Sequence, residues 1–335
     1  MSKQAPLESF IELTGHELPT LSAARSRTAK RLKERRELVS DLRHDDDAAI
    51  VLLGSWGRHE VTGGSDDDYL LLVDGKRHEN VRPTVKQVSS RLSKDRAGAR
   101  GPGRERTFGT VVFSHDLLNK IGLNRDTNSN LTQRSLLMLE SEWISGRAIH
   151  ERARRAVIES YLHDTIKDFR PPRFLLNDLI RYWRTIGVDF VAKVRTRKGQ
   201  GWGLRNAKLR TSRKLLFASG LLPALSCHEL RADEMAHYLI EQFSMPPADR
   251  LAEAFTRYHA LAHGTSTLAS YDQFLELLDN AAVRAELNAI ASGAEAAASP
   301  AFDTIARLGV AIDQGLLGLL FSPALERWTR DFSIL

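Results

Sequence analysis

The chain has 335 residues and a formal net charge of +6, and hydrophobic residues make up 42% of it. This composition is typical of a soluble globular protein and excludes a disordered or collagen-like chain. The single cysteine, Cys227, excludes an intramolecular disulfide and a cysteine-rich zinc site, and it indicates a reducing compartment. No apolar run approaches the roughly 20 residues of a membrane span, and no signal-peptide pattern is present. We therefore expect a cytoplasmic protein with no membrane partner.

The first part of the chain alternates helical and strand-like segments. An arginine-rich segment predicts a helix that packs through Leu21, Ala24, Thr28, Leu32 and Leu38, with its basic side chains facing either solvent or a nucleic acid. Short apolar runs that follow predict buried strands. In chain order we expect a helix at 20–43, strands at 48–53 and 68–73, a helix at 79–92, a Gly- and Arg-rich loop at 96–106 and a strand at 107–114.

The second part of the chain predicts helices only. The expected helices cover residues 131–143, 147–161, 174–197 and 204–219, and several segments beyond Cys227. The segment 174–197 has a helical apolar period, formed by Leu176, Leu179, Trp183, Ile186, Phe190 and Val194. Between Arg170 and Lys214 there are 13 Lys and Arg but only 2 Asp, so the remaining chain carries a net charge of −5. This regional positive charge predicts a phosphate-bearing partner.

The chemically richest stretch is residues 52–73, LLGSWGRHEVTGGSDDDYLLLV. Successive side chains of a strand point to opposite faces, so Asp66 and Asp68 share a face while Asp67 is either solvated or paired with a basic residue. Two carboxylates on one face suit Mg²⁺ or Mn²⁺. Gly54 and Ser55 directly follow a strand, and they offer backbone N–H groups and a hydroxyl to a phosphate. This combination is what nucleotidyl transfer requires.

The run GSWGRHEVTGGSDDD resembles the active-site signature of the DNA polymerase β-like nucleotidyltransferase superfamily. Its pattern is most similar to the branch of PII uridylyltransferases and glutamine synthetase adenylyltransferases, and residues 136–150 resemble the helix and turn that leave the catalytic domain there. The matching positions are Gly54, Ser55, Arg58, Glu60, Ser65, Asp66 and Asp68. The resemblance implies an α+β fold, in which a small mixed-sheet nucleotidyltransferase domain precedes an all-α helical domain. We expect an N-terminal helical arm at 1–46, the catalytic domain at 47–150 and the helical domain at 151–335.

The resemblance also implies roles for individual residues. Asp66 and Asp68 would hold the metal, and Gly54, Ser55 and Ser65 would contact an NTP such as ATP. Arg58 could support either the turn or the phosphates, with Glu60 orienting it. The superfamily commonly has a third carboxylate on a later strand, but the segment TFGTVVFS has none within it. Asp116 is the preferred candidate, although it would equally suit a helix cap, and Glu105 is the alternative. From the helical domain, the candidates for triphosphate contact are Arg205, Lys208 and Lys214.

The expected reaction moves an NMP from an NTP to a hydroxyl and releases pyrophosphate. The branch resemblance favours a protein acceptor, while the regional basic charge favours RNA, including tRNA. Trp202 in its glycine-rich loop could stack on a base. Two alternatives stay open: synthesis of a nucleotide second messenger, and a catalytically dead nucleotide-binding sensor.

Overall fold

The computed structural model describes residues 4–42, 47–76, 87–88, 90–92, 109–119, 121–163 and 166–334. Its contacts divide the chain into two compact units. The first, here called the sheet unit, is Ala24–His163, and the second, here called the helical unit, combines Met1–Ala23 with Asp164–Leu335. The expected N-terminal arm at 1–46 is thus shared between the two units.

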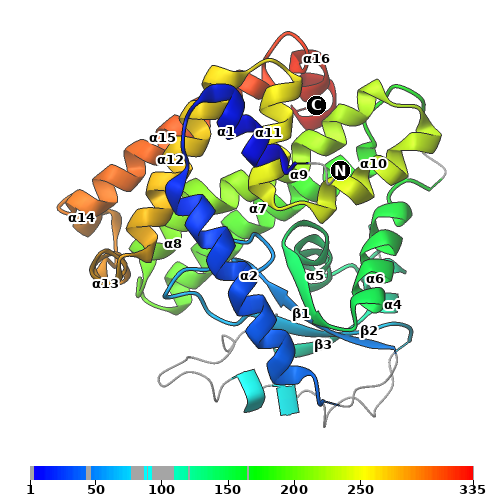
Figure 1. Ribbon diagram of the computed structural model, residues 1–335, viewed down its shortest axis with the longest axis horizontal. Helices are drawn as coiled ribbons and strands as arrows, with labels where there is room; N and C mark the ends of the chain where they lie inside the picture. Colours follow the sequence, from blue (N-terminus) through cyan, green and yellow to red (C-terminus); the bar gives the residue numbers. More distant parts are fainter. Residues whose placement is uncertain are drawn as a thin grey trace. The chain divides into compact units, whose positions relative to one another are not determined.

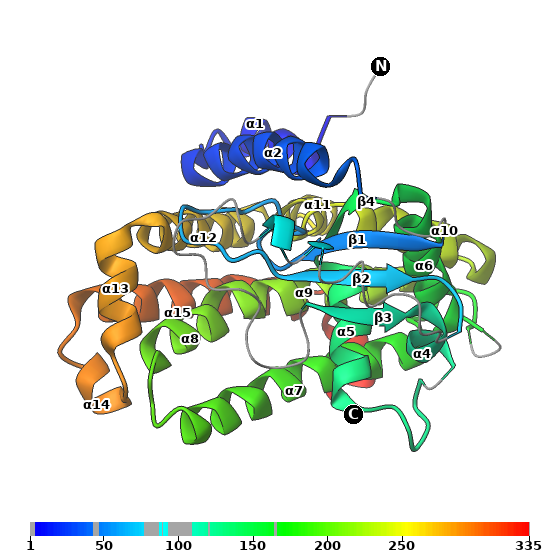
Figure 2. The ribbon, with the colours of Figure 1, turned by 90° about the horizontal axis from the view of Figure 1, so that it is seen from below.

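The sheet unit contains a four-stranded mixed sheet with the strand order β3-β2-β1-β4. Strand β1 (Ala48–Leu53) pairs antiparallel with β2 (Tyr69–Val73) and with β4 (Ser141–Ser145), whereas β3 (Thr110–Phe113) runs parallel to β2. The three strands β1, β2 and β3 lie side by side in Figure 2. The structure confirms the α+β fold class and the mixed sheet.

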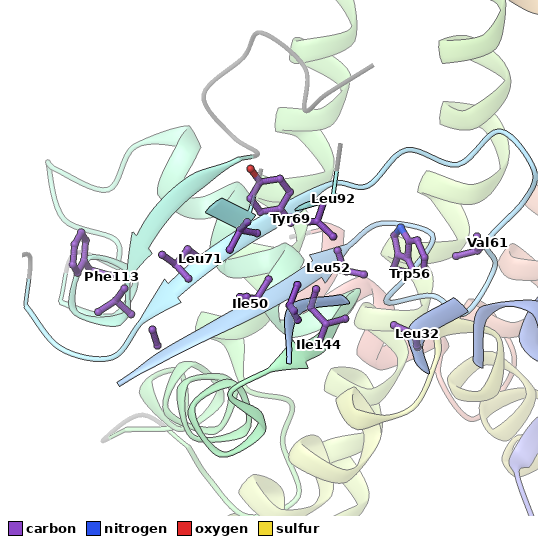
Figure 3. Close-up of a cluster of buried hydrophobic side chains, with 14 residues drawn as sticks. Leu32, Ile50, Leu52, Trp56, Val61, Tyr69, Leu71, Leu92, Phe113 and Ile144 are labelled. Atoms are coloured by element: carbon purple, nitrogen blue, oxygen red, sulfur yellow. The ribbon is translucent and has the colours of Figure 1, made fainter. Parts of the chain in front are cut away.

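The core of the sheet unit forms around β1 and β2, in which every residue is buried. This follows from their unbroken apolar sequences, which are typical of strands covered on both faces. Figure 3 shows the side chains of this cluster along the strands, with Trp56 and Val61 beyond the end of β1. The core therefore continues from the strands into the Gly-Ser turn that follows β1.

The described part of the sheet unit includes the helices α2 (Pro19–Val39), α4 (Ser114–Leu118), α5 (Asn128–Leu139) and α6 (Arg147–Ser160). The first residues of α2 belong to the helical unit and the rest to the sheet unit. Leu21, Ala24, Thr28 and Leu32 are buried, as the periodicity predicted. Of the helix expected at 79–92, residues 87–88 and 90–92 are described and are helical, whereas the loop at 96–106 lies outside the described residues.

Strand β4 corrects the prediction of a helix through residue 143. Helix α5 ends at Leu139, and Glu140 has φ −148°, which turns the chain into an edge strand on β1. Glu142 and Trp143 are both half-buried, and the pairing shifts register between Ile50 and Val51. A short strand with a bulge lacks the clean alternation that identifies strands in a sequence.

The helical unit is all-α within its described residues, as predicted. Its long helices α12 and α15 pack side by side (Figure 1). No helix in the described ranges is both long and apolar enough to cross a membrane. The helices are α1 (Pro6–Thr14), α7 (Arg173–Thr196), α8 (Trp202–Lys208), α9 (Lys214–Ser226), α10 (Ala232–Ser244), α11 (Pro247–Arg257), α12 (Leu261–Asp279), α13 (Ala281–Ala289), α14 (Gly293–Ala296), α15 (Pro300–Leu320) and α16 (Glu326–Thr329).

Two π-helical segments complete the helical unit. Leu209–Arg213 joins α8 to α9 without a break, and Arg330–Ile334 follows α16. The helix expected at 204–219 is therefore longer than predicted. Pro223 lies inside α9 instead of ending it.

Candidate active site

The Gly-Ser turn follows β1 directly and closes on itself through backbone hydrogen bonds. The N–H of Arg58 donates to Gly54 O over 3.0 Å, and the N–H of Glu60 donates to Ser55 O over 2.8 Å. Gly54 has φ +68°, a conformation that glycine adopts without steric cost. A Cβ built at Gly54 would meet nothing within 4 Å, so the space beside this backbone is open. A ligand atom can therefore approach the turn at Gly54.

Arg58 is held between two buried carboxylates. Its Nε lies 2.8 Å from Glu60 Oε2, and its Nη1 donates to Glu140 Oε2. The side chain of Arg58 is 13% exposed, and those of Glu60 and Glu140 are each 1% exposed. Because both contacts are buried charge pairs, they fix the guanidinium against the turn. The structure thus supports the role of Arg58 in stabilising the turn, which is one of the two roles expected of it, and its contact with phosphate stays a prediction.

Gly57 allows the turn to pack against the junction of α5 and β4. A Cβ on Gly57 would lie 2.0 Å from the carbonyl carbon of Glu140 and 2.3 Å from the nitrogen of Ser141. Real side chains do not tolerate such distances, so the second glycine of the Gly-Ser-Trp-Gly sequence serves close packing. The side chain of Glu140 thereby reaches Arg58 from an element about 80 positions later in the chain.

The loop that carries the aspartates is fixed by its own hydroxyl groups and by Trp56. The N–H of Thr62 donates to Ser65 Oγ over 2.9 Å, and the two hydroxyl oxygens are 3.1 Å apart. The fully buried Trp56 donates from Nε1 to Asp66 O over 3.2 Å. Ser65 is buried, so its hydroxyl shapes the loop in this structure; it was expected to contact nucleotide.

Helix α2 also forms hydrogen bonds to this loop. Thr28 Oγ1 accepts the N–H of Val61 over 3.0 Å, and Arg27 donates to Val61 O over 3.2 Å. One turn further along α2, Arg31 donates to Thr62 O over 3.3 Å. Residues four apart lie on one face of a helix, so this face of α2 follows the loop. Sequence reasoning had assigned these arginines to solvent or to nucleic acid.

Asp67 is paired, which confirms one of the two expectations for it. Its Oδ2 lies 3.2 Å from Arg35 Nη2, and both side chains are 10% exposed or less. The guanidinium of Arg35 also lies 5.7 Å from the centre of the Trp56 ring. The middle aspartate therefore anchors the loop to α2, whereas Asp66 is exposed and Asp68 is half-buried.

Asp66 and Asp68 lie at the entrance to β2, next to the Gly-Ser turn. The N–H of Leu53, the residue before Gly54, donates to Asp68 O over 2.8 Å. The donor set fits Mg²⁺, which proteins often bind through one or two carboxylates together with substrate phosphates. Within the described ranges, no group of three or more His, Cys, Asp and Glu side chains is arranged to hold a metal by itself.

The strand register places Asp116, the preferred candidate for the third carboxylate, at the opposite end of the strands from Asp68. Strands β2 and β3 are parallel, with Val73 opposite Phe113, and Asp116 lies beyond that end in α4. Asp68 precedes β2 at the other end of the strands. The five residues of β2 span roughly 17 Å. Asp116 does not cap α4 either, because the cap position is Phe113. The other candidate, Glu105, lies outside the described residues.

The three basic candidates Arg205, Lys208 and Lys214 belong to the helical unit. Arg205 donates from Nη2 to Gln200 O over 2.6 Å, and Lys214 pairs with Asp313 of α15. Lys208 is half-buried near the end of α8. The structure thus brings together the predicted residues of the turn and the aspartate loop, and it gives Arg205 and Lys214 partners in their own unit.

Trp202 packs inside the helical unit at the start of α8. Its ring is stacked on Phe302 at 5.5 Å and lies 6.4 Å from Phe190. This packing accounts for Trp202 without a bound base.

His150 of α6 supports β4 from within the core. Ser141 Oγ donates to Leu137 O over 2.6 Å, so it accepts from His150 Nε2, which is 2.8 Å away. Burial lowers the pKa of His150 to about 4, and the nearby charge of Arg154 acts in the same direction. His150 is therefore neutral at physiological pH and holds the strand that follows Glu140.

A family model described as "Putative nucleotidyltransferase DUF294" matches residues 18–98. The match covers α2, β1, the Gly-Ser turn, the aspartate loop and β2. It supports a nucleotidyltransferase domain. No curated protein and no solved structure matches the chain. The matched segment includes α2, and this agrees with the contacts of Arg27, Arg31 and Arg35 to the aspartate loop within the same segment.

Sequence reasoning missed Glu140 and Arg35 as parts of the site. Arg27, Arg31 and Arg35 are spaced four apart, which places them on one helix face and was a usable signal. Glu140 had no such signal, because its partner Arg58 is far away in the sequence.

Proposed function

We propose that the protein transfers an NMP from an NTP to a hydroxyl of a protein or RNA acceptor, in the manner of the uridylyltransferase and adenylyltransferase branch that its motif resembles. The observation that carries this proposal is the pairing of Leu53 with Asp68. It sets Asp66 and Asp68 beside the turn at Gly54. Carboxylates for a divalent cation and an open backbone for phosphate are then neighbours.

In the proposed reaction the acceptor oxygen bonds to the α-phosphorus as the bond between that phosphorus and the α–β bridging oxygen breaks. Pyrophosphate leaves with the released electron pair, and the proton of the acceptor hydroxyl passes to solvent. Gly54 and Ser55 would hold the terminal phosphates, and Asp66 and Asp68 would hold Mg²⁺. The bound cation would offset phosphate charge and favour deprotonation of the acceptor hydroxyl. Arg58 keeps the turn in shape.

The candidates for a third carboxylate in this proposal are Glu105, which lies outside the described residues, and Asp116. The N–H of Gly109, directly before β3, donates to Tyr69 O over 2.8 Å, so β3 begins where β2 begins. Glu105 precedes Gly109 by four residues, whereas Asp116 follows the far end of β3. We expect Glu105→Gln to abolish transfer and Asp116→Asn to retain it.

The alternative function is a nucleotide-binding sensor without turnover. It is favoured by one observation: among the described residues, no group of three or more His, Cys, Asp and Glu side chains is arranged to hold a metal. A second-messenger synthase shares the same reaction, with a second nucleotide as acceptor.

The test supplies each α-labelled NTP with Mg²⁺ or Mn²⁺ to the full chain, together with tRNA, with cell extract or with neither. Label in RNA, in protein or in a small product distinguishes the acceptors. The variant Asp66→Asn/Asp68→Asn should label nothing. The control Asp233→Asn/Asp303→Asn removes two exposed carboxylates of the helical unit and should label as the wild type does. Equal labelling by the first variant contradicts the site assignment, and NTP binding without labelling by the wild type supports the sensor.

A further inference from the structure

The helical unit contains a cationic cavity that the proposed reaction does not use. Its volume is about 280 Å³, and it lies between the start of α7 and the segment around α16. This is near the lower end of the roughly 300–1,000 Å³ typical of small-ligand sites. Three arginines and one carboxylate line it, a net charge of +2. The lining residues are Arg170, Arg173, Arg327, Trp328, Asp331 and Phe332.

Aromatic rings hold two of these arginines in place. The guanidinium of Arg173 lies 4.7 Å from the centre of the Phe332 ring, and that of Arg327 lies 5.2 Å from the centre of the Trp328 ring. Stacking on a ring uses the face of a guanidinium and leaves its N–H groups available at the edge. The contact of Arg327 Nε to Asp331 Oδ2 is long, at 3.7 Å, and exposed.

The wall of the cavity is itself supported. Trp328 lies 5.7 Å from Phe332 and 4.9 Å from His228, and His228 stacks on Tyr258 at 6.5 Å. Tyr258 in turn donates its hydroxyl hydrogen to Ser226 Oγ over 2.8 Å. These ring contacts connect the wall of the cavity to the core. The rings against which Arg173 and Arg327 lie are therefore held in place.

Within the part of the chain that the structure describes, Arg170 and Arg173 lack the acidic partners that Arg257 and Arg330 of the same unit have. Arg257 pairs with Glu229 at 2.9 Å and Arg330 with Glu326 at 2.5 Å. Among the described residues, no carboxylate forms an ion pair with Arg170 or Arg173, and both are exposed at the cavity. Two neighbouring arginines without acidic partners favour an anionic ligand.

We propose that this cavity binds the phosphate group of a small phosphate-bearing molecule. Three guanidinium groups provide paired N–H donors whose geometry matches phosphate oxygens, and the net charge of +2 complements a phosphomonoester. None of its lining residues takes part in the proposed transfer reaction, so the cavity is a second ligand site of the chain. Inorganic phosphate and the phosphate of a nucleotide are the two sources of this chemistry.

The test is isothermal titration of the full chain with inorganic phosphate, AMP and adenosine, in EDTA and without NTP. We expect phosphate and AMP to bind and adenosine not to bind. A higher affinity for AMP than for phosphate would show that the nucleoside contributes; equal affinities would show a site for phosphate alone. Because metal and NTP are absent, the result is independent of transfer activity.

The decisive variant is Arg170→Gln/Arg173→Gln, and its matched control is Arg184→Gln/Arg195→Gln, which removes two exposed charges of α7 outside the cavity. The first should raise the Kd by at least about tenfold, since each charge-assisted bond lost weakens binding. The control should change it less than about twofold. Asp331→Asn should lower the Kd. Absence of phosphate and AMP binding by the wild type, or equal weakening by both double variants, overturns the proposal.

Discussion

The buried charge cluster around Arg58 makes the sharpest prediction. Replacing Arg58 by Met leaves Glu60 and Glu140, each with a 1% exposed side chain, without the cation between them. Removing one partner from a buried ion pair costs about 3–5 kcal/mol. Each 1.4 kcal/mol is about a factor of ten in an equilibrium constant. We therefore expect the turn of Arg58→Met to open at least about 100 times more often than that of the wild type.

Hydrogen exchange measures this opening locally. The N–H groups of Arg58 and Glu60 close the turn by bonding to Gly54 O and Ser55 O. Mass spectrometry of peptides that cover residues 54–60 should show at least about 100-fold faster exchange in the variant, whereas peptides from α12 and α15 should stay unchanged.

The control applies the same substitution to an exposed pair. Arg152 lies 2.7 Å from Asp74, but the two side chains are 53% and 29% exposed, so Arg152→Met should cost less than about 1 kcal/mol. Adding Glu60→Gln and Glu140→Gln to Arg58→Met should restore much of the protection, because no buried charge then remains. Protection of the turn in Arg58→Met equal to that in Arg152→Met would refute the reasoning.

Three further predictions concern neighbouring residues. Arg35→Met should lower the free energy of unfolding by about 3 kcal/mol, and adding Asp67→Asn should recover part of it; additive losses in urea denaturation would argue against the pair. Gly57→Ala should lower the thermal midpoint far more than Gly54→Ala. The methyl group at position 54 enters open space and costs about 1–2 kcal/mol only because of the positive φ. Equal shifts would contradict the close packing of Gly57 against Glu140. The pKa of His150 is lowered from 6.5 to about 4 in the folded state, so the unfolded chain binds the proton first as the pH falls. The free energy of unfolding should therefore fall by up to about 3 kcal/mol as the pH drops from 6.5 to 4. In urea denaturation, His150→Gln should lack this part of the pH dependence.

Parts of the sheet unit were predictable from local patterns in the sequence. Unbroken apolar runs predicted β1 and β2, and the helical period predicted the buried face of α2. Strand β4 was not predictable in the same way, because it exists only through pairing with β1 and follows a helix without a glycine or proline between them. Edge strands of this kind are decided by tertiary contacts, not by local preference.

The candidate site was likewise predictable only in part. The sequence predicted that Asp67 is either solvated or paired with a basic residue, and it pairs with Arg35. The three aspartates precede β2, so the argument from strand faces does not itself apply to them. The position of Asp116 relative to Asp68 was not predictable, because a sequence does not state whether neighbouring strands are parallel. In a parallel pair, the residues after β3 lie at the far end from the residues before β2.

The packing of the Gly-Ser turn against α5 has a consequence for the search for related chains. Gly57, Arg58, Glu60 and Glu140 form one steric and electrostatic unit, so a change in any one of them is unfavourable unless another changes with it. Related chains should therefore keep or replace these residues together. A search that requires this combination, with its last member about 80 positions after the others, would be more selective than one based on the aspartates alone.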